Sequence, residues 1–247
     1  MRDDLGAEVP IRRPGRVVSL VPSLTEAIEA TVPGVLVGAT DWCTCPPGLE
    51  VARVRGPKNP DRRLISALGP DLAIANQEEN RRHDIERLRD AGVPVWVTRI
   101  DSIAQALDSL ARLFGEVFAL PRVDWLDQAR EVWATPPRLR GRVAVPVWRD
   151  PWIWVGQATY PHDLLRRLGL TNVVDGERYP HCSQRDIADQ RPDLVLLPDE
   201  PYPFTPTDGP DALAPSVPVS GRSLFWYGPA MVEARPSLEA LLEQHLP

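Results

Sequence analysis

The sequence predicts an α/β protein of two Rossmann-like lobes with parallel sheets, joined by a single bridging helix, with a ligand cleft between the lobes. Short apolar runs of strand length alternate with segments whose apolar residues recur at helical spacing, a pattern typical of parallel sheets covered by helices. In addition, ISALGPDLAIANQEE at residues 65–79 echoes IADQRPDLVLLPDEP at residues 187–201. Each copy reads as a short helix, Pro-Asp-Leu, a buried strand and acidic residues, which indicates two similar lobes.

A helical segment at residues 121–133, with Pro at its start and Pro136-Pro137 after its end, separates the two copies. This order predicts four parts: an N-terminal extension (1–15), lobe 1 (16–115), the bridging helix (116–138) and lobe 2 (139–247).

Lobe 1 begins with RVVSLVPSLTE at residues 16–26. This stretch predicts a buried strand that turns at Pro22 directly into a helix. Ser23 and Glu26 have the S-x-x-E spacing of a capping box. Free N–H groups at such a helix start suit a ligand oxygen or an anion, so Ser23 is a candidate binding residue. The alternative is an ordinary joint between a strand and a helix.

The remaining elements of lobe 1 follow from the same periodicity. Strands are expected at 35–39, 72–75 and 93–97, and helices near 64–68, 82–91 and 103–114. In lobe 2, strands are expected at 142–147, 194–197 and 217–220, with a strand or loop at 173–174. Its helices are expected near 161–168, 184–189 and 229–246, the last with a break at Pro236.

Ligands of parallel sheets collect at the carboxyl ends of the strands. The polar segments that follow the expected strands should therefore line the cleft. They are residues 40–45, 76–80, 148–154 and 221–228.

Composition excludes several functional classes. A net charge of −6 and an isoelectric point near 5.3 argue against a nucleic-acid-binding face. No apolar run approaches the about 18 residues that span a bilayer, so no membrane insertion is expected. The N-terminus lacks the apolar core of a signal peptide, and three cysteines fit a reducing compartment. These observations predict a cytoplasmic protein.

In their order and spacing, six segments resemble the helical-backbone (class III) periplasmic-binding-protein family, and are closest to the cobalamin-binding substrate-binding proteins of ABC importers. The segments are RVVSLVPSLTE, VGATDWCTCPP, GPKNPDRRLISALGPDLAIA, DIERLRDAGVPVWV, SQRDIADQRPDLVLL and GRSLFWYGP, and the resemblance covers residues 16–245. It implies two lobes that hold a metal chelate, corrinoid or haem with little hinge motion. It also implies that Trp42 occupies the position of a ligand-stacking aromatic, and that His181-Cys182 replaces a tryptophan common in lobe 2.

Two departures from the family suggest a cytosolic relative that does not serve the standard importer. The exported members carry a signal sequence, which this chain does not show. In the importers, one carboxylate on each lobe docks onto arginines of the permease, and those two positions carry Arg63 and Arg185 here. Because reversed charges turn attraction into repulsion, docking to a standard permease is not expected.

Large flat ligands are held by stacking over a wide apolar face, with a few polar groups that fix their orientation. The aromatic candidates come from the expected cleft loops, with Trp152 and Trp154 on one side of a strand; the alternative is that several fill the core of lobe 2. They are Trp42, Trp148, Trp152, Trp154, Phe225, Trp226 and Tyr227. The polar candidates are Ser23, Lys58, Asn76, Glu78 and Arg222, and the alternative for the charged residues is a solvated loop.

Cys43, Cys45, His181 and Cys182 form a candidate metal set, since thiolates and imidazole are soft ligands for zinc, copper or a chelated metal. Cys45 and His181 are also candidate contacts to an organic ligand. The alternative is that the cysteines act as small buried apolar residues.

No nucleophile elbow, phosphate-binding glycine loop or H-E-x-x-H motif is present, so catalysis is not expected. The sequence thus predicts a binding protein that needs no cofactor and captures a cobalamin-like corrinoid or related metal chelate. The alternatives are a haem, siderophore or transition-metal receptor, and a cytosolic enzyme or scaffold that reuses the fold.

Overall fold

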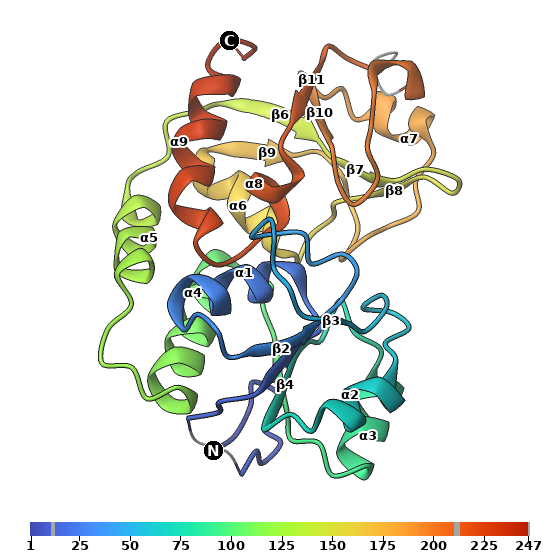
Figure 1. The fold of residues 1–247 in the computed structure, drawn as a ribbon. Coiled ribbons are helices and arrows are strands. Elements are labelled where there is room, and N and C mark those ends of the chain that lie inside the picture. Colours follow the sequence, from blue (N-terminus) through green and yellow to red (C-terminus); the bar gives the residue numbers. More distant parts are fainter. Residues whose placement is uncertain (11–12, 210–212, 247) are drawn as a thin grey trace. The chain divides into compact units, whose positions relative to one another are not determined.

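The computed structural model describes residues 1–10, 13–209 and 213–246 (Figure 1). The chain divides into two compact units. Unit 1 comprises Met1–Ile100, Ala104–Asp127 and Tyr227–Pro229, and unit 2 comprises Asp101–Ile103, Gln128–Trp226 and Ala230–Pro247. The ligand cleft expected between the lobes stays a prediction.

Unit 1 is built on a five-stranded sheet of order β3-β2-β1-β4-β5, in which every neighbouring pair is parallel. Its strands are β1 (Val17–Ser19), β2 (Leu36–Ala39), β3 (Ala52–Arg53), β4 (Leu72–Asn76) and β5 (Val95–Thr98). Every residue of β1, β4 and β5 is buried, because helices cover both faces of the sheet. The parallel α/β fold predicted for this region is confirmed.

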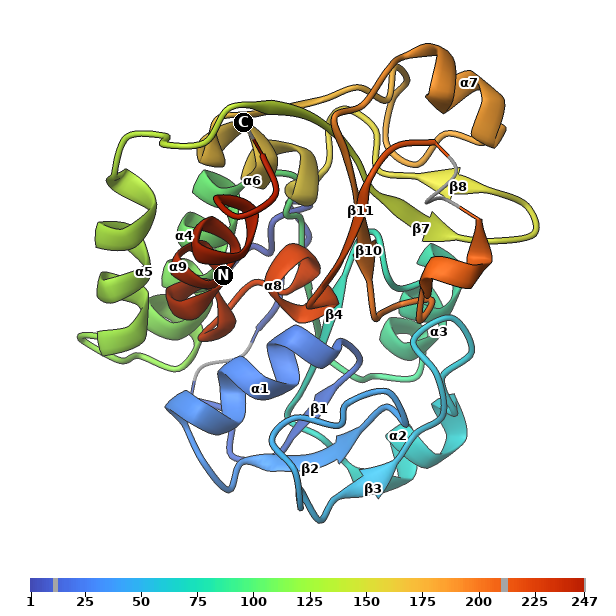
Figure 2. The same cartoon turned by 90° about the horizontal axis from the view of Figure 1, so that it is seen from above.

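Helices α2 and α3 cover one face of this sheet, and α1 lies across the sheet from them (Figures 1 and 2). Ile65 of α2 and Ile85 and Leu88 of α3 share a core with inward-facing strand residues such as Val18 and Ala73. The helical segments that begin in the first half of the chain are α1 (Pro22–Thr31), α2 (Arg62–Leu68), α3 (Arg82–Asp90), α4 (Ile103–Arg112) and the π-helical turn η1 (Leu113–Val117).

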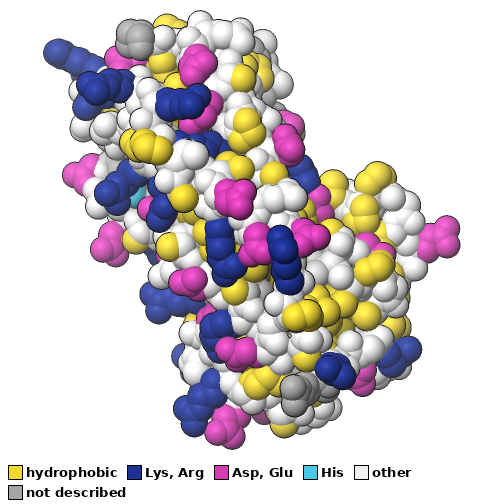
Figure 3. Space-filling model, turned by 90° about the vertical axis from the view of Figure 1, so that its left-hand side faces the viewer, with side chains coloured by type: hydrophobic (Ala, Val, Ile, Leu, Met, Phe, Trp, Pro, Cys, Tyr) yellow, Lys and Arg dark blue, Asp and Glu magenta, His cyan; other side chains and the backbone are white. Residues whose placement is uncertain are grey.

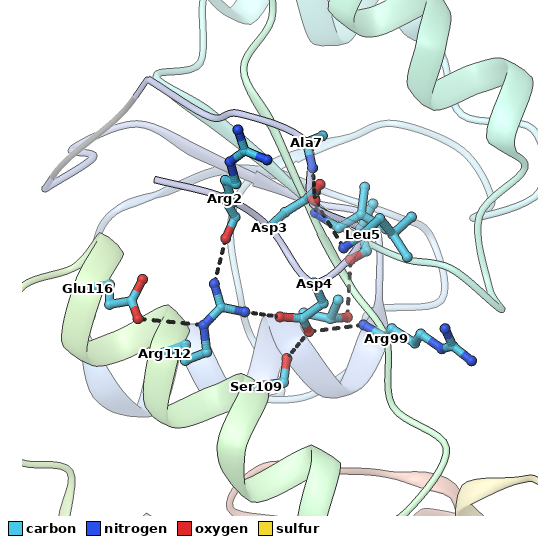
Figure 4. A network of polar contacts seen from close by, with 12 residues as sticks. Arg2, Asp3, Asp4, Leu5, Ala7, Arg99, Ser109, Arg112 and Glu116 are labelled. Carbon is cyan, nitrogen blue, oxygen red and sulfur yellow. Dashed lines mark hydrogen bonds and ion pairs between the residues drawn. The ribbon is translucent and has the colours of Figure 1, made fainter.

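The first ten residues pack against β5, the edge strand of this sheet (Figure 4). The Asp4 N–H donates to Val97 O at 3.2 Å, and the Asp3 carboxylate accepts from the Val97 N–H and from Arg89 at 2.7 Å. Asp4 in turn pairs with Arg112 at 2.6 Å. Because an open edge strand invites pairing with other chains, the N-terminal segment protects unit 1 as well as extending it.

Unit 2 contains a parallel four-stranded sheet of order β11-β10-β6-β9 and an antiparallel hairpin, β7-β8. The strands are β6 (Gly141–Ala144), β7 (Pro146–Trp148), β8 (Ile153–Trp154), β9 (Leu170–Asn172), β10 (Leu194–Pro198) and β11 (Ser216–Val219). The single strand expected at 142–147 is therefore two strands, because Pro146 lacks the N–H that would continue the ladder of β6. Residues 173–174, expected as a strand or loop, are loop: they directly follow β9, which ends at Asn172.

The remaining helices are α5 (Asp124–Ala134), α6 (Tyr160–Leu168), α7 (Gln184–Asp189), the short 3₁₀ turn η2 (Pro206–Asp208), α8 (Gly221–Phe225) and α9 (Ala230–Leu242). Helix α5 lies within the range expected for the bridging helix, and the boundary after Asp127 falls inside it. The break expected at Pro236 is wrong, because α9 continues through that residue. Pro236 is exposed, so water can reach the carbonyl that loses its N–H partner, while Ala234 and Leu238 hold the helix in the core.

The surface carries charges of both signs. On the face drawn in Figure 3, lysine and arginine side chains are interspersed with aspartate and glutamate and do not gather into one basic patch. Across the described parts of the chain, no helix has both the length and the apolar character that a bilayer crossing requires.

Candidate ligand-binding residues

The carboxyl ends of the unit 1 strands are held together by Asn76, the last residue of β4, and by Asn80 in the loop after it. Asn80 accepts a hydrogen bond from the Asn76 N–H at 2.8 Å and donates to Leu20 O, after β1, and to Pro57 O. The Asn76 carboxamide accepts from the Glu78 and Glu79 N–H groups and donates to the Thr98 hydroxyl at 3.1 Å. Asn76, a predicted ligand contact, is thus buried and used to join loops within unit 1.

Ser23 does not form the expected capping box. Helix α1 begins at Pro22 with Val21 as its N-cap, and no side chain caps it. Ser23 therefore lies one residue inside the first turn, where its hydroxyl cannot reach the N3 amide as a cap does. The Ser23 side chain is buried and lies near the phenol of Tyr227, whose pKa it affects.

Tyr227 enters the polar cluster of unit 1 from the far end of the sequence. Burial raises the pKa of its phenol well above the usual value and the nearby Glu79 carboxylate adds to the rise, while the neighbouring Ser23 and Thr98 hydroxyls oppose it. The following residue, Gly228, has φ +127°, and a Cβ there would lie 3.2 Å from the Cβ of Ala27 in α1. This close approach seats Tyr227 beside the carboxyl ends of β1 and β5 as a neutral hydrogen-bonding group.

Lys58 and Glu78 meet at the rim of the same cluster, since Lys58 Nζ donates to the Glu78 carbonyl at 2.6 Å. Loss of hydration lowers the pKa of Lys58, and the Glu79 and Glu78 carboxylates oppose that shift. Both predicted residues therefore lie where a polar group of a ligand could exchange with the existing contact.

Trp42 is the most exposed large apolar side chain in the described part of unit 1, at 65%. It lies in the loop after β2, beside Gly56 of the GPKNPD loop. A Cβ on Gly56 would come within 3.4 Å of Trp42 Nε1 and 2.7 Å of Asn59 Oδ1, so glycine permits this indole to rest against the neighbouring loop. Its flat face is available for stacking.

The candidate metal residues of unit 1 differ in environment. Cys43 is fully buried, and its sulfur lies 3.0 Å from both the Thr25 and Thr40 hydroxyls. Burial raises the pKa of this thiol, which disfavours the thiolate that a metal needs. Cys45 is partly exposed. Within the residues that the structure describes, no group of three or more His, Cys, Asp or Glu side chains is arranged to hold a metal ion.

Five aromatic rings form a continuous row in unit 2. Trp154 stacks on Trp152 at 5.6 Å between ring centroids, Trp152 on Phe204 at 5.8 Å, and Phe204 contacts Tyr202 at 4.6 Å. Tyr202 then meets Trp148 edge to face at 5.6 Å. Trp154 is fully buried, whereas Trp148 is 44% exposed. The row therefore starts in the core of unit 2 and ends at the surface of the β7-β8 hairpin.

His181 and Cys182 run alongside this hairpin. His181 forms an isolated antiparallel bridge with Ile153, and the Cys182 carbonyl accepts the Trp154 Nε1–H at 3.0 Å. His181 is exposed. Cys182 is partly buried, which raises the pKa of its thiol, with a further contribution from Asp186.

Helix α8 carries the last group of predicted residues. The Arg222 guanidinium lies 5.7 Å from the Trp226 ring centroid, and Trp226 is only 7% exposed. Trp226 and Tyr227 are thus buried, while Phe225 and Arg222 are partly exposed.

Sequence reasoning missed Glu200, next to this helix. Its carboxyl is partly buried, which raises its pKa; the Asp199 carboxylate adds to the rise, and a hydrogen bond from Trp226 and the charge of Arg222 oppose it. The internal repeat could have identified Glu200, because aligning residues 65–79 with 187–201 places Glu200 at the position of Glu78. Tyr202 and Phe204 were also missed, although their spacing of two matches that of Trp152 and Trp154.

Known proteins that are similar to this chain in sequence include two vitamin B12-binding proteins, and no protein-family description matches the chain. A vitamin B12-binding protein of Vibrio cholerae is 26% identical over 193 residues, which cover 73% of this chain and 69% of that protein. A vitamin B12-binding protein of Vibrio vulnificus is 25% identical over 239 residues, which cover 92% and 86%.

Solved structures share the fold. The periplasmic vitamin B12-binding protein of Vibrio cholerae matches with a TM-score of 0.73 at 19% identity, over 94% of this chain and 98% of that one. A periplasmic heme-binding protein of Pseudomonas aeruginosa matches with a TM-score of 0.77 at 20% identity, over 95% and 94%. Each of these relatives and neighbours is a binding protein, for vitamin B12 or for heme, and not an enzyme.

The comparison corrects the expected cytoplasmic location. Both solved structures are periplasmic proteins, which points to a periplasmic and not a cytoplasmic protein. The prediction failed because it rested on the residues at the start of the chain and on an odd cysteine count, and neither reports on the compartment of a folded domain.

Proposed function

We propose that this chain, which belongs to the helical-backbone family of periplasmic binding proteins, captures a cobalamin-like corrinoid or a related metal chelate by stacking and hydrogen bonding. The observation that carries the proposal is the pair of exposed indoles, Trp42 on unit 1 and Trp148 on unit 2. Trp42 follows the carboxyl end of the parallel strand β2, where α/β folds bind ligands, and Trp148 is the last residue of β7. The vitamin B12-binding relatives support the choice of ligand class.

Stacking on these rings contributes enough favourable free energy to support ligand binding. An aromatic side chain exposes roughly 200 Å², so covering the exposed part of Trp42 removes roughly 130 Å² from water. At about 25 cal/mol per Å², this contributes about 3 kcal/mol, before the cost of ordering the ligand. Lys58, Glu78, Arg222 and Tyr227 are the polar groups that we expect to orient the ligand.

The test is a titration of the purified protein with cobalamin, cobinamide and haem, followed by tryptophan fluorescence and by ligand absorption. We expect saturable quenching by a corrinoid at micromolar concentration or below. Trp42→Ala should weaken binding, whereas Trp125→Phe should not. The latter removes one of the eight tryptophans from the signal without touching the proposed site. Unchanged quenching in both variants would contradict the role of Trp42.

Haem is the second candidate, and the exposed imidazole of His181 favours it. A neutral imidazole ligates haem iron directly. If haem is the ligand, its absorption band should shift on binding, and His181→Ala should abolish that shift. A corrinoid that binds equally well to wild type and to His181→Ala would favour the first candidate. If wild type binds none of the three ligands, both candidate functions are excluded.

A further inference from the structure

A pocket lies within unit 2, and none of its lining residues belongs to the aromatic row. It has a volume of about 440 Å³ and opens between helix α6 and β9, the edge strand of the sheet. Gln157, His162 and Arg166 line it together with residues 169–172. Apart from glycine and Leu170, each lining side chain carries a polar group, so the pocket suits a polar ligand.

The pocket holds an uncompensated positive charge. Arg166 is exposed, and none of the described side chains forms an ion pair with it. The nearest carboxylate on the same helix is Asp163, and its Oδ2 already accepts from Arg167 and from the Ile103 N–H, both at 2.9 Å. The Asp175 carboxylate accepts a hydrogen bond from the Gln157 side-chain amide at 3.4 Å. A guanidinium without a partner offers a fork of donors suited to a carboxylate or phosphate.

The hydrogen bonds of Asn172 determine the tautomer of His162. The Asn172 oxygen accepts the Val174 N–H at 3.2 Å, and its nitrogen donates to Val155 O at 2.8 Å. That nitrogen also lies 3.4 Å from His162 Nδ1, which must then act as the acceptor. The proton of the neutral imidazole therefore sits on Nε2, which leaves Nε2–H as the donor of the ring.

The electrostatics of His162 agree with this arrangement. Burial lowers the pKa of the imidazole, the Arg166 guanidinium lowers it further, and Asp163 opposes both. An anion in the pocket would relieve the repulsion between the imidazolium and Arg166.

We propose that this pocket binds a small oxyanion, a phosphate or carboxylate group, through the Arg166 guanidinium and His162 Nε2–H. The Thr171 hydroxyl and the Gln157 amide complete the polar lining. A volume of about 440 Å³ exceeds what a bare phosphate needs, so the oxyanion is the charged end of a larger metabolite. This binding is separate from the proposed capture of a metal chelate, because the two sets of residues do not overlap.

The experiment is a proton NMR titration of the full chain, which has four histidines, with inorganic phosphate, citrate and sodium chloride at matched ionic strength. We expect a saturable shift of one imidazole signal with phosphate or citrate and not with chloride. His162→Ala should lack that signal, which assigns it.

Arg166→Gln is the decisive variant, because it removes the guanidinium charge from an exposed side chain and opens no cavity in the core. It should weaken binding at least fivefold. Arg87→Gln, which removes an exposed arginine from α3 of unit 1, is the matched control and should bind like wild type. A dissociation constant unaltered in Arg166→Gln, an equal response to chloride, or no saturable shift with either oxyanion would each overturn the proposal.

Discussion

The exposed fraction of the side chain distinguishes two tryptophans that have similar sequence surroundings. Trp42 is 65% exposed, whereas Trp154 is fully enclosed in unit 2. Both occur in polar, turn-rich segments with neighbouring prolines. Stacking on a ligand requires an open ring face, so we assign ligand contact to the first and core packing to the second.

Truncating the two rings should therefore have opposite effects. Trp42→Ala should weaken ligand binding by roughly 10- to 100-fold, since 1.4 kcal/mol corresponds to tenfold, and should leave the free energy of unfolding nearly unchanged. Trp154→Ala should lower that free energy by about 3–5 kcal/mol, because it opens a cavity in a packed core. Ligand titration and urea unfolding of both variants measure the two effects. A destabilised Trp42→Ala would show that its indole packs against the protein.

Glu200 should make stability depend on pH. The pKa of Glu200 is higher in the folded protein than in the unfolded chain. The folded state therefore keeps this proton at pH values where the unfolded chain has already released it. Stability then falls as the pH rises from the unfolded pKa, about 4.5, through the folded one. Glu200→Gln should consequently stabilise the protein at pH 8 relative to wild type and give little gain at pH 4.

Unfolding midpoints at several pH values test this. Glu243→Gln, which removes the same charge from an exposed position just after α9, is the control. If Glu200→Gln stabilises the protein equally at every pH, ionisation of the Glu200 carboxyl is not the cause of the pH dependence.

Among the elements, the N-terminal segment offers a buried and an exposed ion pair for comparison. The Asp3 side chain is fully buried and pairs with Arg89, whereas Glu8 pairs with Arg2 at the surface. Removing one partner of a buried pair leaves the other charge without compensation, so Asp3→Asn should destabilise unit 1 by about 3 kcal/mol.

Glu8→Gln is the matched control and should cost at most about 1 kcal/mol. Urea unfolding of both variants gives the comparison. Equal, small effects would mean that the first ten residues are not part of the cooperative fold of unit 1.

The internal repeat places Arg63 and Arg185 at equivalent points of α2 and α7. Asp61 caps α2 and Ser183 caps α7, so each arginine is the second helical residue. A cation in the first turn opposes the helix dipole, and both side chains are exposed.

Arg63→Glu/Arg185→Glu should therefore gain up to about 2 kcal/mol of stability in total. It should also bind a cobalamin-type permease more tightly than wild type does, because the carboxylates restore attraction to the permease arginines. Thermal unfolding and a pull-down with the permease measure the two effects. A permease that binds wild type at micromolar affinity would refute the proposed role of the two arginines.

At the scale of the whole molecule, ligand capture should stabilise the protein. A ligand that binds only the folded chain, present at 100 times its dissociation constant, adds about 2.7 kcal/mol. At roughly 2–4 °C per kcal/mol for a chain of this size, the melting temperature should rise by roughly 5–10 °C. A corrinoid that leaves the melting temperature unchanged at saturating concentration would contradict capture by the folded state.

The amino-acid sequence was enough to predict the alternation of strands and helices, the parallel sheets and the resemblance between residues 65–79 and 187–201, because these depend on the spacing of nearby apolar residues. Exit loops such as that of Asn76 followed from the same spacing. The folded structure is needed to see that Ser23 does not cap its helix and lies near Tyr227, and that Asn80 joins three loops. Such contacts join residues far apart in the chain, and which partner a side chain finds, or whether it stays exposed like Trp42, depends on packing that local periodicity does not encode.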